Sequence, residues 1–377
     1  MLKMKKSIIL TSITLLIILT GCQTQWQITL SRQGENAGEI SRDTVNVNIE
    51  NSADEITEVP LGQLFYDNGF TIIDEVMFTD ENGSSTSFDW NDIGQTATIN
   101  ETGEIWLEGD VTLTPTEITV IPDPLTSAIS YSIMDIAPTM ADVLGLPELP
   151  EAEGKVIFEG KADYGVMILL DGTQYDKLLA LTAEGKLPFF EQMDPIQAGL
   201  TVFPPITTSS SASFLTGAHP SKTGVYGYGY RTTELTTILD IAAQEGRTVV
   251  AVEGTSVPFN LRNAEITMSG DRDGNGYYDD NVMKNSLDVI QSEMPDLMYI
   301  HFQEIDDMGH EFGPDSDEYE SAIIRVDSFL SEIYNALPEK TLLVIFADHG
   351  MHTTADGGNH GTLIASDLII PIIFLEK

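Results

Sequence analysis

Short, nearly continuous apolar runs separated by helical patterns dominate the chain from about residue 160 onward. Four of these runs are five to seven residues long, which is typical of strands buried on both faces; they lie at 164–170, 248–252, 297–302 and 341–347. Between the last two, apolar residues recur from Tyr319 to Ile333 at the spacing of an amphipathic helix. Strands that alternate with helices predict an α/β fold, with a mostly parallel sheet sandwiched by helices.

The earlier part of the chain has a different pattern. Residues 23–125 carry shorter runs with partial alternation, separated by turn signals such as Asn68-Gly69 and Asn82-Gly83. No histidine occurs there. We expect a small β-rich accessory domain that ends at the linker 121–124, and a larger domain over 126–377.

The first 22 residues predict a lipoprotein signal peptide. Three lysines precede an apolar run from Ile8 to Leu19, and the run ends in the motif Leu-Thr-Gly-Cys22. This motif resembles the bacterial lipoprotein box, in which the cysteine is lipidated. We therefore expect an extracytoplasmic protein anchored to the cell membrane through Cys22, with an uncleaved anchor helix as the alternative. Because Cys22 is the only cysteine, no internal disulfide can form.

The charge of the chain restricts its partners. It has 18 Lys and Arg against 59 Asp and Glu, a formal net charge of −41. A surface of this kind cannot neutralise phosphates broadly, so we expect no nucleic-acid binding and interpret the acidity as a solvated surface.

Candidate metal ligands follow several of the predicted strands. Asp171 ends the first, Asp306 and His310 follow the third, and Asp348 and His349 follow the fourth. Five of the six histidines fall between residues 301 and 360. Imidazole and carboxylate together suit zinc or manganese, and strand ends in an α/β sheet open into its ligand-binding crevice. Each residue alone also fits a loop cap or a helix-surface pair.

The motifs around these residues resemble the alkaline phosphatase superfamily, and within it the type I phosphodiesterase/nucleotide pyrophosphatase branch. The resemblance covers roughly 165–362 and rests on five short motifs in the same order. They are Leu169-Leu-Asp-Gly172, Thr207 ten residues before Gly217, Asp306-x-x-Gly-His310, Ala347-Asp-His-Gly350 and Asn359-His-Gly361.

The resemblance implies a two-metal hydrolase of small phosphate esters or nucleotide-like substrates. It assigns Asp171, Thr207, Asp348 and His349 to one metal, and Asp306, His310 and His360 to the other. Two Zn²⁺ are expected, although the ligands would also accept Mn²⁺. Thr207 would be the nucleophile in cleavage of phosphodiester or pyrophosphate bonds. The alternatives are a phosphomonoesterase or phosphonate hydrolase of the same superfamily, and a non-catalytic surface-binding lipoprotein.

The sequence departs from the family pattern in three places. Ser210 stands where nucleotide pyrophosphatases place a phosphate-binding Asn, so we assign Ser210 to substrate binding. The sulfatase signature is missing. The segment 135–147 normally follows the last histidine ligand but here precedes the first strand of the large domain. We interpret this order as a circular permutation, which predicts that helix 136–144 packs beside the C-terminal strand.

Two further motifs stand outside this pattern. Oxygen ligands at Asp271, Asp273, Asn275, Tyr277 and Asp279 resemble the start of an EF-hand-type calcium loop without its final Glu, and a solvated acidic turn is the alternative. The run Tyr226-Gly-Tyr-Gly-Tyr230 fits either loop packing or stacking of a nucleobase or aryl group.

Overall fold

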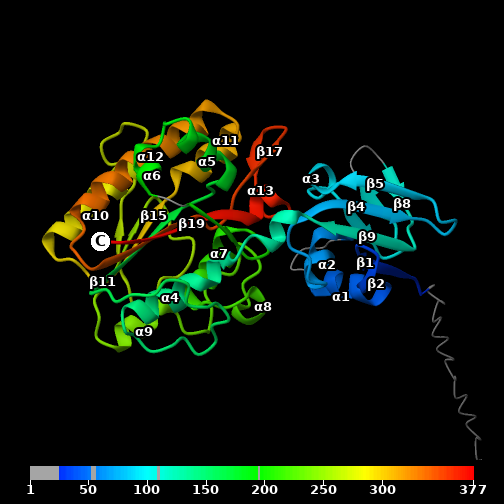
Figure 1. Cartoon of the computed structure of the whole chain (residues 1–377), viewed down its shortest axis with the longest axis horizontal. Helices are drawn as coiled ribbons and strands as arrows, with labels where there is room; N and C mark the ends of the chain where they lie inside the picture. Colours follow the sequence, from blue (N-terminus) through cyan, green and yellow to red (C-terminus); the bar gives the residue numbers. More distant parts are fainter. Residues whose placement is uncertain (1–24, 52–56, 108–110, 194–195) are drawn as a thin grey trace, which may run out of the picture.

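The computed structural model describes residues 25–377 except 52–56, 108–110 and 194–195. The signal peptide and Cys22 lie outside the described residues, so the lipid anchor stays a prediction. Among the described residues, no helix is long and apolar enough to cross a membrane. The described chain has an N-terminal β-rich region and a larger α/β region, which lie side by side (Figure 1).

An eight-stranded sheet forms the centre of the α/β region, with the order β10-β12-β19-β16-β11-β15-β13-β14. Its central strands are parallel and coincide with the four predicted apolar runs: β11 (Tyr164–Leu170), β13 (Val249–Glu253), β15 (Leu297–Phe302) and β16 (Thr341–Phe346). The outer strands are β10 (Tyr131–Ser132), β12 (Gln197–Leu200), β14 (Glu265–Met268) and β19 (Ile369–Glu376). Only β19 runs antiparallel to its neighbours, so the predicted mostly parallel sheet is confirmed.

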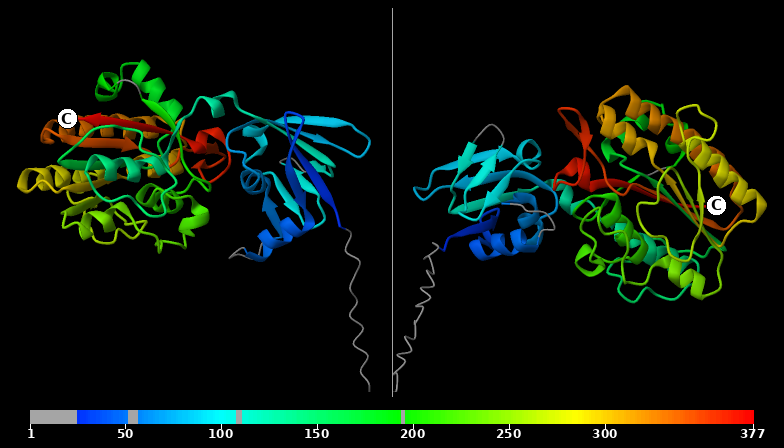
Figure 2. Two further views of the ribbon diagram at one scale, coloured as in Figure 1. Left: turned by 60° about the horizontal axis from the view of Figure 1, so that its bottom comes forward. Right: turned by 180° about the vertical axis from the view of Figure 1, so that it is seen from behind.

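Helices cover both faces of this sheet (Figures 1 and 2). One face packs against α4 (Ile136–Val143), α7 (Thr207–Thr216) and α9 (Ile238–Gln244). The other packs against α5 (Tyr175–Ala183), α6 (Pro188–Gln192), α10 (Asp279–Ser292) and α12 (Asp317–Ala336). Along β11, Met167 and Leu169 enter the first core while Val166, Ile168 and Leu170 enter the second. A strand buried on both faces has no polar side to alternate with, which explains the continuous apolar runs.

Helix α4 belongs to the core of the large sheet. Its buried residues share one cluster with Ile370 and Ile372 of β19, and Phe158 beyond the helix stacks on Phe374 at 6.1 Å between ring centroids. Helix 136–144 therefore packs against the large sheet and contacts β16, the strand next to β19, whereas direct packing on β19 itself stays a prediction. The circular permutation that led to this prediction remains a hypothesis.

The N-terminal region contains two smaller sheets. The first has the order β2-β1-β9-β4-β5 and the second the order β3-β6-β7-β8. Their strands are β1 (Gln27–Arg32), β2 (Glu35–Ser41), β3 (Glu58–Pro60), β4 (Ile73–Thr79), β5 (Ser85–Asp89), β6 (Thr98–Asn100), β7 (Ile105–Leu107), β8 (Val111–Leu113) and β9 (Glu117–Pro122). The helices α1 (Arg42–Asn51), α2 (Leu61–Asp67) and α3 (Trp90–Ile93) were not predicted. The boundary near residue 125 stays a prediction.

The N-terminal core extends onto the α/β region. Its apolar cluster includes Phe203, which precedes α7, and Leu363, which precedes α13 (Ala365–Leu368). The indole N–H of Trp90 donates to the carbonyl of Leu363 at 2.5 Å. The N-terminal region therefore contacts two segments of the α/β region, the one that precedes α7 and the one that precedes α13.

Candidate metal centre

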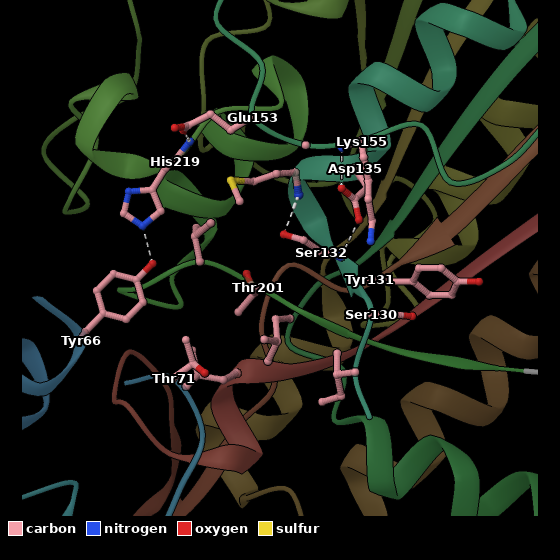
Figure 3. A pocket seen from close by; sticks show the side chains of 16 residues that line it. Tyr66, Thr71, Ser130, Tyr131, Ser132, Asp135, Glu153, Lys155, Thr201 and His219 are labelled. Atoms are coloured by element: carbon pink, nitrogen blue, oxygen red, sulfur yellow. Dashed lines mark hydrogen bonds between the residues drawn. The ribbon is translucent and has the colours of Figure 1, made fainter. Parts of the chain in front are cut away.

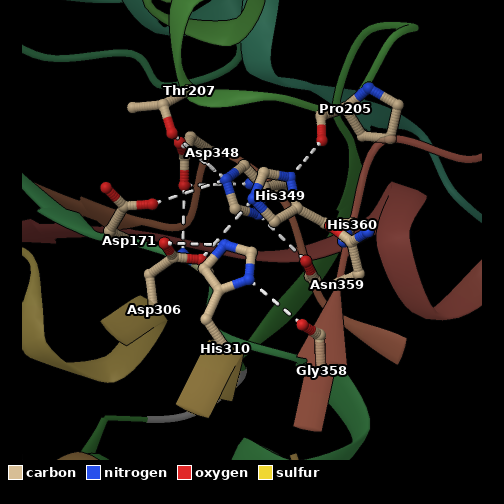
Figure 4. Close-up of polar contacts among 12 residues, drawn as sticks. Asp171, Pro205, Thr207, Asp306, His310, Asp348, His349, Gly358, Asn359 and His360 are labelled. Atoms are coloured by element: carbon tan, nitrogen blue, oxygen red, sulfur yellow. Dashed lines mark hydrogen bonds and ion pairs between the residues drawn. The ribbon is translucent and has the colours of Figure 1, made fainter. Parts of the chain in front are cut away.

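The candidate ligands meet where the parallel strands of the large sheet end (Figure 4). Asp171 follows β11, and Asp348 and His349 follow β16, which is a parallel neighbour of β11. Asp306 lies in the first turn of α11 (Glu304–Phe312), directly after β15, the other parallel neighbour. The carboxyl ends of neighbouring parallel strands share one crevice. Three carboxylates and an imidazole are thereby brought together.

The remaining predicted ligands reach the same place. His310 lies one turn after Asp306, with its Nε2 3.3 Å from Oδ2 of that residue. Thr207 is the first residue of α7, and its Oγ1 lies 3.3 Å from Nε2 of His349. His360 follows the hairpin of β17 (His352–Thr354) and β18 (Gly357–Asn359), and its ring stacks on that of His349 at 3.6 Å between centroids. All seven predicted ligands thus lie in one cluster.

Hydrogen bonds to the backbone fix which nitrogen of each histidine faces the cluster. The Nδ1 atom of each ring donates to a carbonyl oxygen, from His310 to Gly358 (3.1 Å), from His349 to Gly350 (2.9 Å) and from His360 to Pro205 (2.9 Å). A carbonyl can only accept, so each Nδ1 carries a proton and each Nε2 faces the cluster, where it can bind either a proton or a metal ion. Metal-binding histidines are oriented in this way.

The carboxylates show a similar division between their two oxygens. Oδ1 of Asp348 accepts from the backbone N–H groups of Gly172 and His349, Oδ2 of Asp171 contacts His301, and Oδ2 of Asp306 contacts His310. The other oxygen of each carboxylate is buried and has no hydrogen-bond partner among the described residues. Two of these free oxygens, Oδ1 of Asp171 and Oδ2 of Asp348, lie 3.4 and 3.3 Å from Nε2 of His349. Lone pairs that face one another in this way require a proton or a metal cation between them.

The crowding shifts the pKa values of the cluster in both directions. Burial and the neighbouring carboxylates raise the pKa of Asp171 to about 7. The hydrogen bond to Asp306 raises the pKa of His310 to about 9. Burial and the adjacent His349 lower the pKa of His360 to about 4. The groups compete for few protons, and a bound cation would relieve the repulsion between the carboxylates.

The donor set fits a pair of metal ions. Ligand atoms converge within 4.8 Å in two groups, Asp171 with Asp348 and His349, and Asp306 with His349 and His360. His349 stands in both groups, whereas the resemblance assigned it to the first alone. His310 lies at the edge of the second, with its side chain 41% exposed. Buried imidazole and carboxylate ligands with open positions suit zinc.

Comparison with known proteins gives a family match. A model of the family "Type I phosphodiesterase / nucleotide pyrophosphatase" matches residues 166–369, just over half of the chain and all seven candidate ligands. This chain belongs to that family. The resemblance that we inferred from five motifs is thereby confirmed.

Curated relatives match over shorter stretches. GPI ethanolamine phosphate transferase 3 of Saccharomyces cerevisiae is 28% identical in an alignment of 156 positions that covers 35% of this chain and 15% of the yeast protein. The human GPI ethanolamine phosphate transferase 3 catalytic subunit is 30% identical over 88 residues, 23% of this chain and 8% of its own length. The chain therefore spans only a small part of these curated relatives.

Solved structures resemble the chain at low identity. Phosphonoacetate hydrolase from Sinorhizobium meliloti 1021, in complex with phosphonoacetate, has a TM-score of 0.43 and 17% identity, covering 56% of this chain and 62% of its own. Murine ectonucleotide pyrophosphatase/phosphodiesterase 5, in complex with AMP, has a TM-score of 0.41 and 18% identity. The match covers 51% of this chain and 58% of the murine chain. The C-terminal periplasmic domain of EptC from Escherichia coli, in complex with Zn, has a TM-score of 0.40 and 18% identity. The match covers 62% of this chain and 77% of the EptC domain.

A buried histidine and a glutamate behind the ligands were not assigned from the sequence. His301 lies on β15, its Nε2 2.9 Å from Oδ2 of Asp171 and its Nδ1 2.7 Å from Oε2 of Glu253. Burial alone would lower the pKa of His301, but the two carboxylates outweigh it and raise the pKa well above its usual value. From the sequence, neither His301 nor Glu253 was given a role. The position of Glu253 at the end of β13 was the available signal, since β13 is the parallel neighbour of β15.

Ser210 does not face a substrate in this family member. The side chain is fully buried, and its Oγ donates to the backbone carbonyl of Asp348 at 2.8 Å and contacts Oγ1 of Thr201 at 2.9 Å. These bonds hold the backbone of a candidate ligand. The geometry therefore corrects our assignment of Ser210 to substrate binding.

The predicted calcium loop forms a compact acidic turn. Asp271 accepts from the N–H groups of Gly274 and Gly276. Asp279 is fully buried and accepts instead from the backbone N–H groups at the start of α11, so its carboxylate does not join the loop. Among the described residues, the carboxylates of Asp271 and Asp273 belong to no converging ligand group. Calcium binding stays a prediction, without Asp279.

The two remaining histidines lie outside the cluster. His352 hydrogen-bonds Asp367 through Nδ1 at 2.8 Å. His219 contacts the hydroxyl of Tyr66 at 2.5 Å and lines a cavity of about 380 Å³ between the N-terminal region and the large sheet (Figure 3). Thr201 also lines this cavity, and its hydroxyl donates to the backbone carbonyl of Asp348.

Proposed function

We propose that this family member hydrolyses phosphodiester or pyrophosphate bonds through Thr207, with two zinc ions held by the seven clustered side chains. The observation that carries the proposal is the set of buried carboxylate oxygens without partners on Asp171, Asp306 and Asp348. They face the same space as the lone pairs of the histidines, beside the Thr207 hydroxyl. Such an arrangement suits a multivalent cation and a nucleophile in contact with it.

Thr207 is positioned for attack on a phosphoryl group. Its side chain is only 7% exposed, which limits competition from bulk water. It lies in the first turn of α7, where the N–H groups lack intrahelical acceptors and the helix dipole favours a negative charge. When bound, zinc would lower the pKa of a coordinated hydroxyl and polarise the phosphoryl oxygens.

The chemistry then needs two displacements at phosphorus. The Thr207 oxygen forms a bond to phosphorus while the bond to the alcohol or phosphate leaving group breaks, and that group takes up the hydroxyl proton. The intermediate is a phosphothreonine whose phosphorus keeps the remaining substituent of the substrate. Water then displaces Thr207 and restores its hydroxyl. Asp171, Asp348 and His349 would hold the metal next to Thr207, and Asp306, His310 and His360 the other. His301 would keep Asp171 turned so that its Oδ1 faces the metal.

A second candidate function is transfer of the phosphoryl group to an alcohol in place of water. The curated relatives named above are ethanolamine phosphate transferases, and an alcohol can replace water in the second displacement. In this case the same Thr207 intermediate would pass its phosphoryl group to an alcohol. Product analysis with added alcohol separates the two reactions.

The test compares bis-p-nitrophenyl phosphate with p-nitrophenyl phosphate on the purified, zinc-loaded protein. We expect Thr207→Ala to lower diester hydrolysis by at least about 10³-fold while the protein still binds zinc. Ser213→Ala is the matched control, because Ser213 is a buried hydroxyl on the same helix whose Oγ has no hydrogen-bond partner among the described residues. Preferential monoester hydrolysis would identify a phosphomonoesterase. No hydrolysis and no bound zinc would leave a binding protein.

A further inference from the structure

The tyrosine-rich loop between α8 (Pro220–Thr223) and α9 reaches the candidate metal centre. Tyr226, Tyr228 and Tyr230 are 47%, 55% and 52% exposed, although large aromatic side chains are usually more buried. Only Tyr228 of the three makes a hydrogen bond to a candidate ligand among the described residues, with its hydroxyl 3.3 Å from Nε2 of His360. The loop therefore places one phenol group at the edge of the cluster.

The loop is fixed to the helix that carries the nucleophile. Oγ1 of Thr208 donates to the carbonyl of Gly227 at 3.2 Å, and the N–H of Tyr230 donates to the same carbonyl at 3.0 Å. At the base of the loop, Oγ1 of Thr233 donates to the carbonyl of Thr223 at 2.9 Å. Tyr228 is thus held in a defined position relative to Thr207.

The direction of the hydrogen bond follows from the histidine. Nδ1 of His360 donates to the carbonyl of Pro205, so Nε2 accepts and the Tyr228 hydroxyl is the donor. A metal ion on Nε2 would take that lone pair and leave the phenol O–H without its acceptor. The O–H would then be available to a substrate oxygen at the same edge of the cluster.

Among the described residues, the ion pairs of the cluster carboxylates involve no lysine or arginine; the partners of Asp171, Asp306 and Asp348 are all histidines. An arginine fork would suit the terminal oxygens of a doubly charged monoester. A neutral phenol supplies a single hydrogen bond and suits the singly charged phosphate of a diester.

We propose that the Tyr228 hydroxyl donates a hydrogen bond to a non-bridging oxygen of the phosphoryl group and favours diesters over monoesters. This inference rests on the proposed function. It makes Tyr228 a specificity-determining residue of the same site.

The experiment compares Tyr228→Phe with Tyr230→Phe. The second variant also removes a phenol hydroxyl from this loop, but from a tyrosine that makes no hydrogen bond to a candidate ligand among the described residues. On the zinc-loaded protein, we expect Tyr228→Phe to lower kcat/KM for bis-p-nitrophenyl phosphate by about 10–100-fold, as for one hydrogen bond to a charged group. The fall for p-nitrophenyl phosphate should be smaller, so the diester-to-monoester ratio drops. Tyr230→Phe should stay within about twofold of the unchanged protein.

Two binding measurements complete the test. Calorimetric zinc titration should give the same stoichiometry for Tyr228→Phe as for the unchanged protein. In a Thr207→Ala background, which prevents turnover, Tyr228→Phe should weaken binding of bis-p-nitrophenyl phosphate by about tenfold or more.

The outcomes separate the two proposals. If Thr207→Ala abolishes diester hydrolysis but Tyr228→Phe leaves kcat/KM and the ratio unchanged, only the role of Tyr228 is wrong. Equal losses in Tyr228→Phe and Tyr230→Phe would also overturn it, since the loop as a whole would then be responsible. If the unchanged zinc-loaded protein cleaves neither ester, both proposals fail.

Discussion

The candidate metal centre and the acidic loop at 271–280 both gather carboxylates, but these carboxylates differ in what they contact. In the loop, Asp273 accepts from the N–H of Asn275 and pairs with Lys284 at 3.1 Å, and the same ammonium lies 2.8 Å from Asp280. In the metal centre, Asp171, Asp306 and Asp348 each keep one buried oxygen with no hydrogen-bond partner among the described residues.

This difference shows which acidic cluster needs a cation. A carboxylate that is exposed and paired with an ammonium costs little to form in the folded protein. A buried oxygen whose nearest polar neighbours are the nitrogens of the cluster histidines needs a proton or a cation between them to offset the cost of its burial. The metal centre is therefore an incomplete structure by itself, whereas the loop already contains its own counter-charge.

The largest effect should come from exchanging one carboxylate for an amide in each region. We expect Asp348→Asn to lose bound zinc and to lower diester hydrolysis by at least about 10³-fold, because an amide oxygen is neutral. Asp273→Asn makes the same change in the loop and should leave the bound zinc and the rate of diester hydrolysis within about twofold of the unchanged protein. Metal analysis and initial rates measure the two effects. An Asp348→Asn protein that keeps both metals would contradict the comparison.

The next effect concerns the residues behind the ligands. We expect His301→Gln to weaken zinc binding by about 10–100-fold, because Asp171 loses the imidazole that orients its Oδ2. Glu253→Gln should have a smaller effect in the same direction, since it acts through His301. His352→Gln is the control, a buried histidine bonded to a carboxylate outside the cluster. Equal zinc affinities for His301→Gln and His352→Gln would show that His301 has no part in positioning Asp171.

A smaller effect should appear in the pH dependence of stability. Because the pKa of His310 is raised from 6.5 to about 9, the folded metal-free protein holds a proton on this residue more tightly than the unfolded chain does between about pH 6.5 and about pH 9. The stability from this proton is present below pH 6.5 and is lost as the pH rises through 9. Zinc competes with the same proton, so the zinc-dependent rise in melting temperature should grow by a few degrees across this window.

Thermal melts in EDTA and in zinc at pH 6.5 and 8.5 test this dependence. His310→Asn removes the titrating group and should flatten it. A zinc-dependent shift that is equal at both pH values in the unchanged protein would show that the proton on His310 is not linked to metal binding.

The sequence predicted the parts of the molecule that local pattern and strand ends determine. The runs around Leu169 and Val344 are buried on both faces, and a strand of that kind has a recognisable composition. Ligands directly after strands could be located because parallel strands end in one crevice. Helices α1 to α3 were missed because they are short and lie within a pattern of β-strands.

Contacts between distant segments were beyond local pattern. The Oγ of Ser210 points to the backbone of Asp348 because of how α7 packs on β16, and spacing from Thr207 does not reveal this. The carboxylate of Asp279 turns toward α11, away from the loop whose spacing it completes. The hydroxyl of Tyr228 meets His360 only in the folded chain. In each case the side chain is directed by tertiary packing and not by its neighbours in sequence.

The smallest effect should be that of calcium on the acidic loop. The ammonium of Lys284 already neutralises Asp273 and Asp280, so calcium has to displace it before binding. We expect 1 mM calcium, a concentration at which extracellular loops bind this ion, to raise the melting temperature by no more than about 2 °C. Lys284→Gln should enlarge this shift, whereas Lys222→Gln, which removes an ammonium from Glu153, should not. If Lys284→Gln gives no calcium-dependent shift either, the loop is a solvated turn and the calcium prediction is wrong. The contrast with the metal centre would then be complete, because only carboxylates without a partner of their own would bind a cation.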